Sequence, residues 1–372
     1  MSQSNSRNFS FVLIGRVISS GLQAMFYLIF AVMMDPADYG NLSYIIALAG
    51  TVSIVSRLGL NQSVTIYQAK NKSELSNNLN ILSVITTITA SLILLPFNIY
   101  AALLCFAISF FIMNIHNLMG LKKYKQYMTT DIVKGILIIS LPIFFYFILE
   151  IPGILIGMSI SYLLCSFNSV KTYSFKKNIF KNFGINPKIL LHNFGVDLSI
   201  YGPKFADKLV VFPILGYYST GIHQLNMQIL FGLEMLPIAL QSFLLSQESS
   251  GKKNNKLSFL IILSSLIIAL IVFFISPFII NELFPKYSEG ISSLQIMIFS
   301  IVPLSIISTF NAKLQSKGST KVGYSVIVRI GSLLILLGLL GSIFGLNGLA
   351  VAVLSSTILH TIFLFLLIQI EK

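Results

Sequence analysis

One stretch of the chain decides its class, and it reads FGVDLSIYGPKFADKLVVFPILG over residues 194–216. The stretch is long and apolar enough to cross a bilayer, yet it carries two aspartates and two lysines. At about 100° per residue, Asp197, Lys204 and Lys208 fall on one arc of a helix, and Asp207 lies beside that arc. The arc is about 16 Å long, roughly half of the hydrocarbon thickness. A charge that faces lipid costs about 3 kcal/mol or more, so we expect this stripe to face a partner or a water-filled cavity.

The composition of the whole chain supports a membrane protein. Its 372 residues are 55% hydrophobic and only 10% charged, whereas a soluble domain is about 25% charged. We therefore predict an all-α polytopic membrane protein. The first apolar run is too long for a signal peptide and has no cleavage site, so we expect it to be retained. Twelve transmembrane helices fit the sequence, roughly at 9–33, 42–68, 79–98, 99–119, 132–149, 153–173, 193–217, 220–245, 257–281, 290–312, 321–343 and 346–369.

The basic residues are distributed unevenly between the predicted loops. The two ends and the even-numbered loops carry nearly all of the loop lysines, and Lys134 is placed at the edge of the same side. The odd-numbered loops carry Lys286 as their one basic residue, together with several acids. Cytoplasmic loops are enriched in Lys and Arg, so both termini are predicted to lie in the cytoplasm and the protein in the cytoplasmic membrane. This asymmetry also accounts for the net charge of +13, so we expect no nucleic-acid partner.

The predicted helices divide into two halves. Residues 1–174 and 193–372 hold six spans each, and residues 175–192 between them read as a cytoplasmic amphipathic linker. A faint internal repeat agrees, because Gly40 and Gly221 fall in corresponding outer turns. Likewise PGILIG at 152–157 opens the sixth span much as NGLAVA at 347–352 opens the twelfth. Transporters built from repeated halves bind substrate at their interface, so we predict two six-helix lobes around a central cavity.

Apart from the lysines at the ends of the spans, eight Lys, Arg, Asp and Glu residues fall inside the predicted spans. The basic ones are Arg16, Arg57, Lys204, Lys208 and Arg329, and the acidic ones are Asp197, Asp207 and Glu234. All except Arg329 lie in spans one, two, seven and eight, the equivalent first pairs of the two halves. This clustering predicts a net-cationic cavity walled by those four helices. Arg329 stands apart in span eleven, where we expect it to snorkel or to cap a carbonyl.

A cationic cavity suits an anionic ligand, because Arg presents a planar fork to phosphate oxygens and Lys a compact charge. The candidate substrate-binding residues are Arg16, Arg57, Lys204 and Lys208. The three buried acids either couple protonation or cation binding to transport or neutralise the bases as structural pairs. Pairing is a strong alternative for Asp207, which is a helical neighbour of both lysines. Gly202 and Pro203 form a candidate hinge, although a static kink explains them equally well.

The sequence contains none of the motifs that would indicate an enzyme. It has no GxxxxGK[ST] phosphate loop and no HExxH motif, so ATP hydrolysis and a catalytic metal are not expected. Cys105 and Cys165 lie in apolar runs and the histidines show no ligand spacing, so we predict neither a metal site nor a cofactor. We read His116, His223 and His360 as residues in ordinary packing or polar contacts.

Several segments resemble one family over nearly the whole chain. They are MMDPADYGNLSYIIALAGTVSIVSRLGLNQSVTIYQAKNKSE at 33–74, DKLVVFPILGYYSTGIHQLNMQILFGLEMLPIALQSFLLSQESS at 207–250, LFPKYSEGISSLQIM at 283–297 and FGLNGLAVAVLSSTI at 344–358. The chain thereby resembles the polysaccharide transporter family of the superfamily of multidrug, oligosaccharidyl-lipid and polysaccharide exporters. That resemblance implies a flippase, which would move a polyprenyl-diphosphate-linked oligosaccharide, as in O-antigen export, by alternating access driven by an ion gradient. It places Arg16, Arg57, Lys204 and Lys208 in the lumen by their positions in the spans.

These residues discriminate between three functions. A flippase for a lipid-linked, negatively charged glycan fits the basic cavity, with the lipid tail remaining in the bilayer and other polysaccharide-assembly proteins as further partners. A cation-coupled exporter of small drugs is the alternative, and it predicts a cavity dominated by acids and aromatic residues. A membrane enzyme that polymerises or ligates glycans would need larger external loops than this chain has. We therefore expect a flippase and no enzyme.

Overall fold

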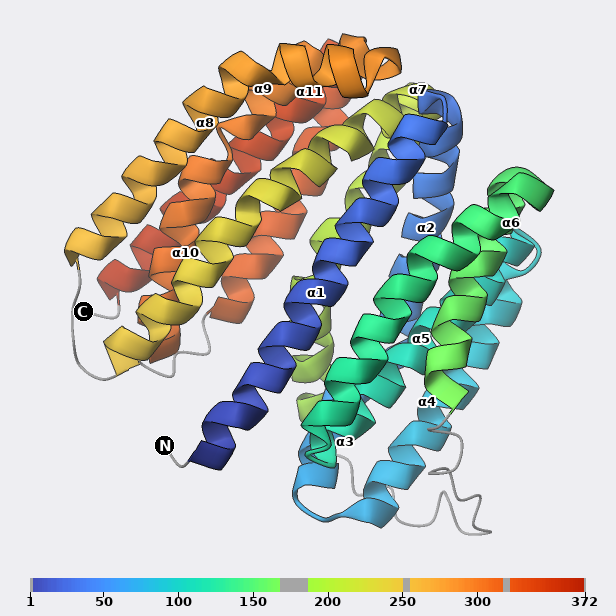
Figure 1. Ribbon diagram of the computed structural model, residues 1–372. Coiled ribbons are helices and arrows are strands. Elements are labelled where there is room, and N and C mark those ends of the chain that lie inside the picture. The colour runs from blue at the N-terminus through green and yellow to red at the C-terminus, as the bar shows by residue number, and fades with distance from the viewer. Residues whose placement is uncertain (1–2, 168–186, 250–254, 317–321, 371–372) are drawn as a thin grey trace. The chain divides into compact units, whose positions relative to one another are not determined.

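We analysed a computed structural model of the chain (Figure 1), which describes residues 3–167, 187–249, 255–316 and 322–370. The described residues form helices and no strand. The α-helices are α1 (Gln3–Met33), α2 (Pro36–Arg57), α3 (Leu60–Ala69), α4 (Ser73–Leu94), α5 (Ile99–Gly120), α6 (Tyr124–Ser166), α7 (Pro187–Ser249), α8 (Asn255–Leu283), α9 (Ile291–Ile298), α10 (Ile301–Ser316) and α11 (Val322–Ile370). A 3₁₀ helix, η2 (Pro285–Gly290), connects α8 to α9. Most of the predicted linker at 175–192 lies outside the described residues.

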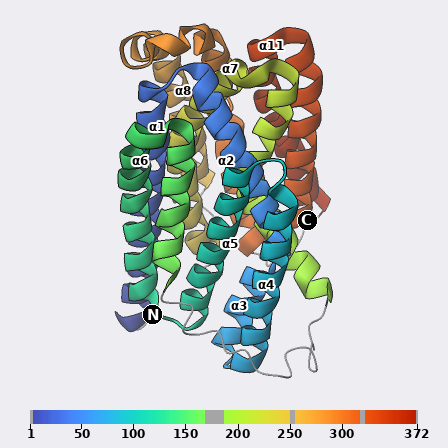
Figure 2. The same ribbon diagram turned by 90° about the vertical axis from the view of Figure 1, so that its right-hand side faces the viewer.

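Three long helices are hairpins, each interrupted by one residue with non-helical backbone angles. The interruptions are Glu150 in α6, Gly216 in α7 and Gly345 in α11. The arms fold back on each other, as the green α6 shows in Figures 1 and 2. A hydrogen bond between Asp207 and His223 joins the two arms of α7 at 3.1 Å. These hairpins correspond to the predicted spans at 132–149 and 153–173, at 193–217 and 220–245, and at 321–343 and 346–369.

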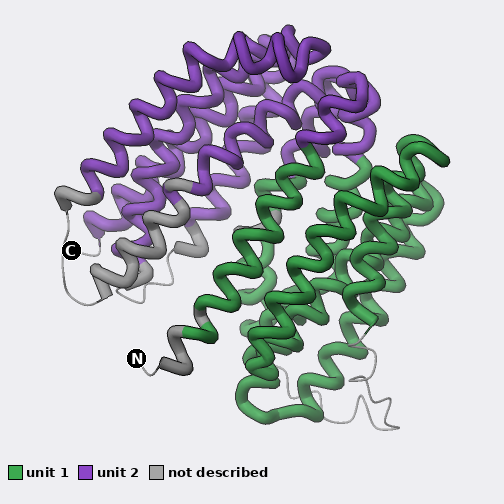
Figure 3. Tube along the Cα trace, viewed as in Figure 1, with its two compact units in different colours: residues 1–27, 45–205 green, residues 28–44, 206–372 purple. Residues whose placement is uncertain are grey.

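The chain forms two compact units (Figure 3), and they interleave along the sequence. Unit 1 comprises residues 1–27 and 45–205, and unit 2 comprises residues 28–44 and 206–372. The end of α1 and the start of α2 therefore pack with the C-terminal half, whereas the first part of α7 packs with the N-terminal half. In unit 1, α5 lies against α3, α4 and α6, and in unit 2, α11 lies against α9 and α10. The predicted six-helix lobes at 1–174 and 193–372 stay a prediction.

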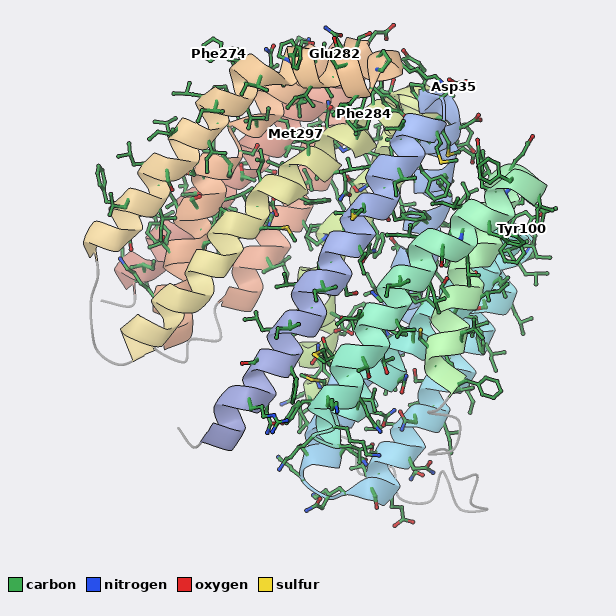
Figure 4. The ribbon with its side chains drawn as sticks, in the orientation of Figure 1. Asp35, Tyr100, Phe274, Glu282, Phe284 and Met297 are labelled. Atoms are coloured by element: carbon green, nitrogen blue, oxygen red, sulfur yellow. The ribbon has the colours of Figure 1, made fainter. Side chains whose placement is uncertain are left out.

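The surface of both units is that of a multi-pass membrane protein. Eight segments of the described chain are long and apolar enough to cross a membrane. Large apolar side chains on them are exposed. Phe147 on α6 is 76% exposed. Phe274 on α8 is 75% exposed and points outward in Figure 4. Exposed apolar surface of this extent suits lipid, not water. The polytopic helical fold is thus confirmed, and the count of twelve crossings stays a prediction.

Each unit has its own apolar core. In unit 1, Leu60, Val64, Leu79 and Met113 form a buried cluster between α3, α4 and α5. In unit 2, the larger cluster joins the arms of α7 and α11 to α9, and its members are Val211, Met227, Leu230, Met297, Leu333, Leu337, Leu349, Ala350, Ala352 and Val353. A second cluster in unit 2 joins α10 to the last turns of α11. The helices are therefore fixed within each unit by side-chain packing.

The two glycines of the predicted repeat contact each other inside unit 2. A Cβ atom added at Gly40 would overlap the carbonyl oxygen of Tyr217 and lie 2.7 Å from the Gly221 nitrogen. A Cβ atom added at Gly221 would overlap the carbonyl oxygen of Pro36 in the same way. Gly221 follows Gly40 by as many positions as Tyr217 follows Pro36, so the crossing of α2 and α7 is locally two-fold symmetric. Both glycines lie within helices, so their predicted place in an outer turn was wrong by about one helical turn.

The second part of the repeat is also present in the backbone. Glu150 has φ 54° and ψ −135°, and Gly345 has φ 59° and ψ −137°. Three positions after each, Gly153 and Gly348 approach a carbonyl oxygen of the preceding arm so closely that a Cβ atom would overlap it. The hairpin turns of α6 and α11 thus share one conformation, although only one of them has glycine at the left-handed position.

Candidate functional site

A break between α2 and α3 builds the polar centre of unit 1. Leu58 and Gly59 both have positive φ, 50° and 74°, so α2 ends at Arg57 and α3 starts in a new direction. The start of α7 packs onto this break, because a Cβ atom at Gly59 would lie 2.7 Å from the Asn193 carbonyl carbon and 2.8 Å from the Leu190 oxygen. Only glycine allows this close approach without strain. The break thereby brings polar residues of α2, α3 and α7 together.

Asp197 is the acid at this junction, and it is fully buried. Its Oδ1 atom accepts hydrogen bonds from Asn61 Nδ2 at 3.0 Å and from Gln62 Nε2 at 3.1 Å. One turn earlier on α7, Asn193 Nδ2 donates to Ser63 Oγ at 2.8 Å. These bonds tie α7 to α3, and Asp197 receives both of its hydrogen bonds from neutral amides.

Arg57 is the buried base of unit 1, with none of its surface exposed. Its guanidinium donates to Ser53 Oγ, which also accepts from Ser109 Oγ at 2.9 Å. A group of hydroxyls thus surrounds the base. Arg57 also interacts electrostatically with the Asp197 carboxylate. Burial of a charge is tolerated when another charge and hydrogen bonds compensate it, and both are present here.

His116 of α5 joins the same network. Its Nε2 atom lies 3.2 Å from Asn61 Nδ2, and its Nδ1 atom lies 2.9 Å from Thr65 Oγ1. The amide nitrogen Nδ2 can only donate, so Nε2 accepts and the ring proton is assigned to Nδ1. Arg57 and Arg16 both act on this ring electrostatically. Arg16 itself lies on α1 with its side chain exposed.

In unit 2, the predicted stripe of charged residues on α7 ends at a buried ion pair. Lys208 Nζ lies 3.0 Å from Asp207 Oδ1, and both side chains are buried. The other carboxylate oxygen of Asp207 bonds to His223 Nε2 at 3.1 Å across the hairpin. The Lys208 ammonium also lies 6.0 Å from the centroid of the Phe231 ring. The charge of Lys208 is therefore compensated within unit 2.

Glu234 and Arg329 correct one expectation. Arg329 was expected to stand apart and to snorkel or cap a carbonyl, but its Nη2 atom lies 3.8 Å from Glu234 Oε1, with 24% and 15% of the side chains exposed. The pair links α7 to α11. The expectation that Arg329 stands apart was wrong because the sequence alone does not show that these two helices are neighbours. His360, on the second arm of α11, interacts electrostatically with the same arginine.

The predicted site residues thus fall into three groups. Arg16, Arg57, Lys204 and Asp197 belong to unit 1, where Arg57 acts electrostatically on Asp197, both arginines act on His116, and the Lys204 side chain is exposed. Lys208 and Asp207 form one pair of unit 2, and Glu234 forms the other with Arg329. Helix α7 continues through Gly202 and Pro203. The hinge there and the cavity between lobes stay predictions.

Sequence reasoning missed one buried ionic cluster. Lys134 Nζ lies 3.1 Å from Asp131 Oδ1 and 2.6 Å from Ser19 Oγ, and Ser19 Oγ lies 2.9 Å from the same carboxylate oxygen. The ammonium also lies 5.5 Å from the centroid of the Phe111 ring. Lys134 was assigned to the edge of a loop, but it is buried inside α6. The spacing of three residues between the acid and the base could have indicated the pair.

Other kinds of site are not evident in the described part of the chain. It contains no group of three or more His, Cys, Asp or Glu side chains that could hold a metal ion. A hollow of about 330 Å³ in unit 2 is lined by Gly232, Leu233, Met235 and Ile268. Its lining is apolar, so it offers no group for an anion.

Comparisons with known proteins agree on the fold. A family described as polysaccharide biosynthesis protein matches residues 6–219, more than half of the chain. An uncharacterized membrane protein of Methanocaldococcus jannaschii is 26% identical, with 97% of each chain covered. The lipid II flippase MurJ, in an inward closed conformation, aligns with a TM-score of 0.79 at 16% identity, covering 97% of this chain and 87% of that one. An inward-facing multidrug transporter of the MATE family aligns with a TM-score of 0.68, also at 16% identity, covering 97% and 98%.

Proposed function

The chain belongs to the polysaccharide biosynthesis protein family, and from this premise we propose that it is a flippase. It moves a polyprenyl-diphosphate-linked oligosaccharide, such as an O-antigen unit or a similar surface polysaccharide unit, across the cytoplasmic membrane. Its termini lie in the cytoplasm. Its partners are this lipid-linked substrate, the membrane lipids and other polysaccharide-assembly proteins. The proposed transport breaks no covalent bond, so the protein needs no catalytic residue or cofactor.

The distribution of charge in unit 1 carries this proposal. Arg16, Arg57 and Lys204 are three cations of unit 1, and Asp197 is the acid that interacts with the buried arginine. Lys208, the fourth predicted substrate-binding residue, lies in unit 2 and is paired with Asp207. Three of the four basic residues predicted to bind the substrate therefore belong to unit 1. A diphosphate offers several oxygens that guanidinium and ammonium groups bind with charge-assisted hydrogen bonds.

The fold supports the same function. The solved structure with a TM-score of 0.79 is that of a lipid II flippase, so a flippase is compatible with this arrangement of helices. Each step of transport would be a shift between the inward-open and outward-open states, driven by the difference in affinity of the two states for the substrate. An ion gradient would supply the direction.

The alternative, an exporter of small cationic drugs, finds support in the likeness to a MATE transporter. Such a function needs acids that a cationic ligand can reach. In the described interior, however, Asp207 and Glu234 each have a basic partner, and Asp197 is fully buried and interacts electrostatically with Arg57. The balance of charge therefore favours an anionic substrate.

Transport in proteoliposomes tests the proposal. We would measure the movement of a fluorescent polyprenyl-diphosphate oligosaccharide, with and without a proton or sodium gradient. The variants Arg16→Ala and Lys204→Ala should each slow movement about tenfold or more, because a hydrogen bond to a charged group contributes about 1.5–3 kcal/mol. The matched control is Lys286→Ala, which removes an exposed lysine that pairs with Asp35. Equal rates in all three variants and the native protein would overturn the proposal, and transport of a small organic cation instead would favour the alternative.

A further inference from the structure

We propose that Asp197 is a proton-binding site, and that it takes up one proton when an anion binds beside Arg57. The inference rests on the proposed function, because it assumes that the phosphate groups of the substrate enter unit 1. It goes further because it assigns proton binding to one of the three predicted acids. It also gives the direction of the coupling between proton binding and anion binding. Proton and substrate bind together and do not compete.

Two buried acceptor atoms at this junction indicate the site. Among the described residues, no donor bonds to Asp197 Oδ2 or to Asn61 Oδ1, although neither atom is accessible. The side-chain amides of Asn61 and Gln62 both donate to the other carboxylate oxygen of Asp197, Oδ1. A buried acceptor without a donor costs about 1–3 kcal/mol. A proton bound at Asp197 Oδ2 would turn one of these two acceptors into a donor and so remove part of that cost.

The other buried acids of the described chain are differently placed. Asp207 has Lys208 and His223 on its two oxygens, and Asp131 is bonded to Lys134. Each of these carboxylates has a cationic partner within hydrogen-bonding distance. Asp197 differs because its hydrogen bonds come from Asn61 and Gln62, which are neutral. A carboxylate held by neutral donors loses less on protonation than one held by an ammonium group.

The groups that face Asp197 come from several helices. Helix α2 contributes Arg57, α3 contributes only neutral amides and α5 contributes His116, on which Arg16 of α1 also acts. On α7 itself, Lys204 follows two turns later. Asn61 donates to His116 Nε2, so this nitrogen is already occupied as an acceptor. The proton is therefore assigned to the carboxylate and not to the imidazole.

The sign of the coupling follows from the burial of Arg57. Its guanidinium is fully buried, and Asp197 supplies a compensating negative charge. Protonation of Asp197 removes that charge and leaves the buried guanidinium with less compensation, which is destabilising. A phosphate anion that enters unit 1 replaces the lost charge. Each binding event thus favours the other, and by linkage the coupling is the same in both directions.

Calorimetric titration of the purified protein in nanodiscs tests this inference, with farnesyl diphosphate as the probe. Titrations at about pH 8, well above the second phosphate pKa of about 6, keep the probe itself from titrating. Repeating them in two buffers of different ionisation enthalpy gives the number of protons taken up. The native protein should take up about one proton, and its Kd should rise about tenfold per pH unit. The variant Asp197→Asn should bind the probe at least as tightly, with no proton uptake and a Kd that does not change with pH.

The variant His116→Gln is the control, because it alters the one other titratable side chain in the network. It should keep the proton uptake. If the native protein binds the probe without taking up a proton, this inference is overturned and the proposed function stays intact. This outcome is measured on the native protein alone, so it does not depend on the folding of any variant. Absence of binding would overturn the proposed function and the inference with it. Proton uptake that is lost in His116→Gln, or a sodium requirement in place of proton uptake, would overturn the assignment to Asp197.

Discussion

Replacing Gly40 by alanine should loosen the crossing of α2 and α7 in unit 2. The added Cβ atom would overlap the Tyr217 carbonyl oxygen and lie 2.7 Å from the Gly221 nitrogen and 2.8 Å from the Tyr217 carbonyl carbon. Packed Cβ atoms keep about 3.4 Å or more from such neighbours, and all three neighbours are backbone atoms, which cannot rotate away. The two helices must therefore separate by roughly 1 Å, since interiors are close-packed. Overpacking of this kind costs about 1–3 kcal/mol.

Thermal unfolding of the purified protein measures this cost. For a unit of about 150–250 residues, each kcal/mol lowers Tm by about 2–4 °C, so Gly40→Ala should lower it by about 2–12 °C. The matched control is Gly338→Ala in α11, where an added Cβ atom meets nothing within 4 Å. Alanine is the better helix former by about 1 kcal/mol, so this control should be neutral or stabilising. Equal Tm values for the two variants would refute the close backbone contact.

Three further outcomes follow from the same structure. Gly221→Ala should cost as much as Gly40→Ala, and the double variant should cost less than the sum, as a double-mutant cycle of unfolding free energies would show, because both substitutions break one contact. Glu150→Gly should raise Tm and Gly345→Ala should lower it, each by an amount that corresponds to about 1 kcal/mol, since only glycine adopts their shared backbone angles without strain; shifts of the same sign would contradict the shared conformation. Lys134→Met should cost about 3–5 kcal/mol by leaving Asp131 uncompensated, and adding Asp131→Asn should restore most of the loss in a thermal unfolding assay; an unchanged loss would contradict the pairing.

The sequence predicted the helical membrane fold well, because the apolar runs that set it are local. The paired spans appear as hairpins, and the repeat at 152–157 and 347–352 marks two turns with matching angles. The conformation of Glu150 could not be predicted, because its side chain gives no sign of a left-handed backbone. Its counterpart Gly345 was the better indicator of a positive φ at this turn, because glycine adopts such angles readily.

The site was predicted in its residue types but not in its partners. The sequence indicated that Asp207 could pair with Lys204 or Lys208, and the structure pairs it with Lys208. Spacing could not show that Arg329 meets Glu234, because the two lie on different helices almost a hundred residues apart. It also placed Asp197 and Lys208 on one stripe, whereas the structure gives them to different units. These contacts depend on tertiary packing, which residue periodicity does not encode.

The interleaving of the two units has a consequence for biosynthesis. Residues 28–44 pack with unit 2, so Pro36 and Gly40, which are buried in the finished protein, are made long before the residues of α7 that they contact. Tyr217 and Gly221 follow about 180 positions later, which corresponds to roughly 10–40 s at 5–20 residues per second. For that time the end of α1 and the start of α2 have only lipid or the insertion machinery to cover them. Residues 28–44 therefore cannot complete their packing before Tyr217 and Gly221 of α7 have entered the membrane.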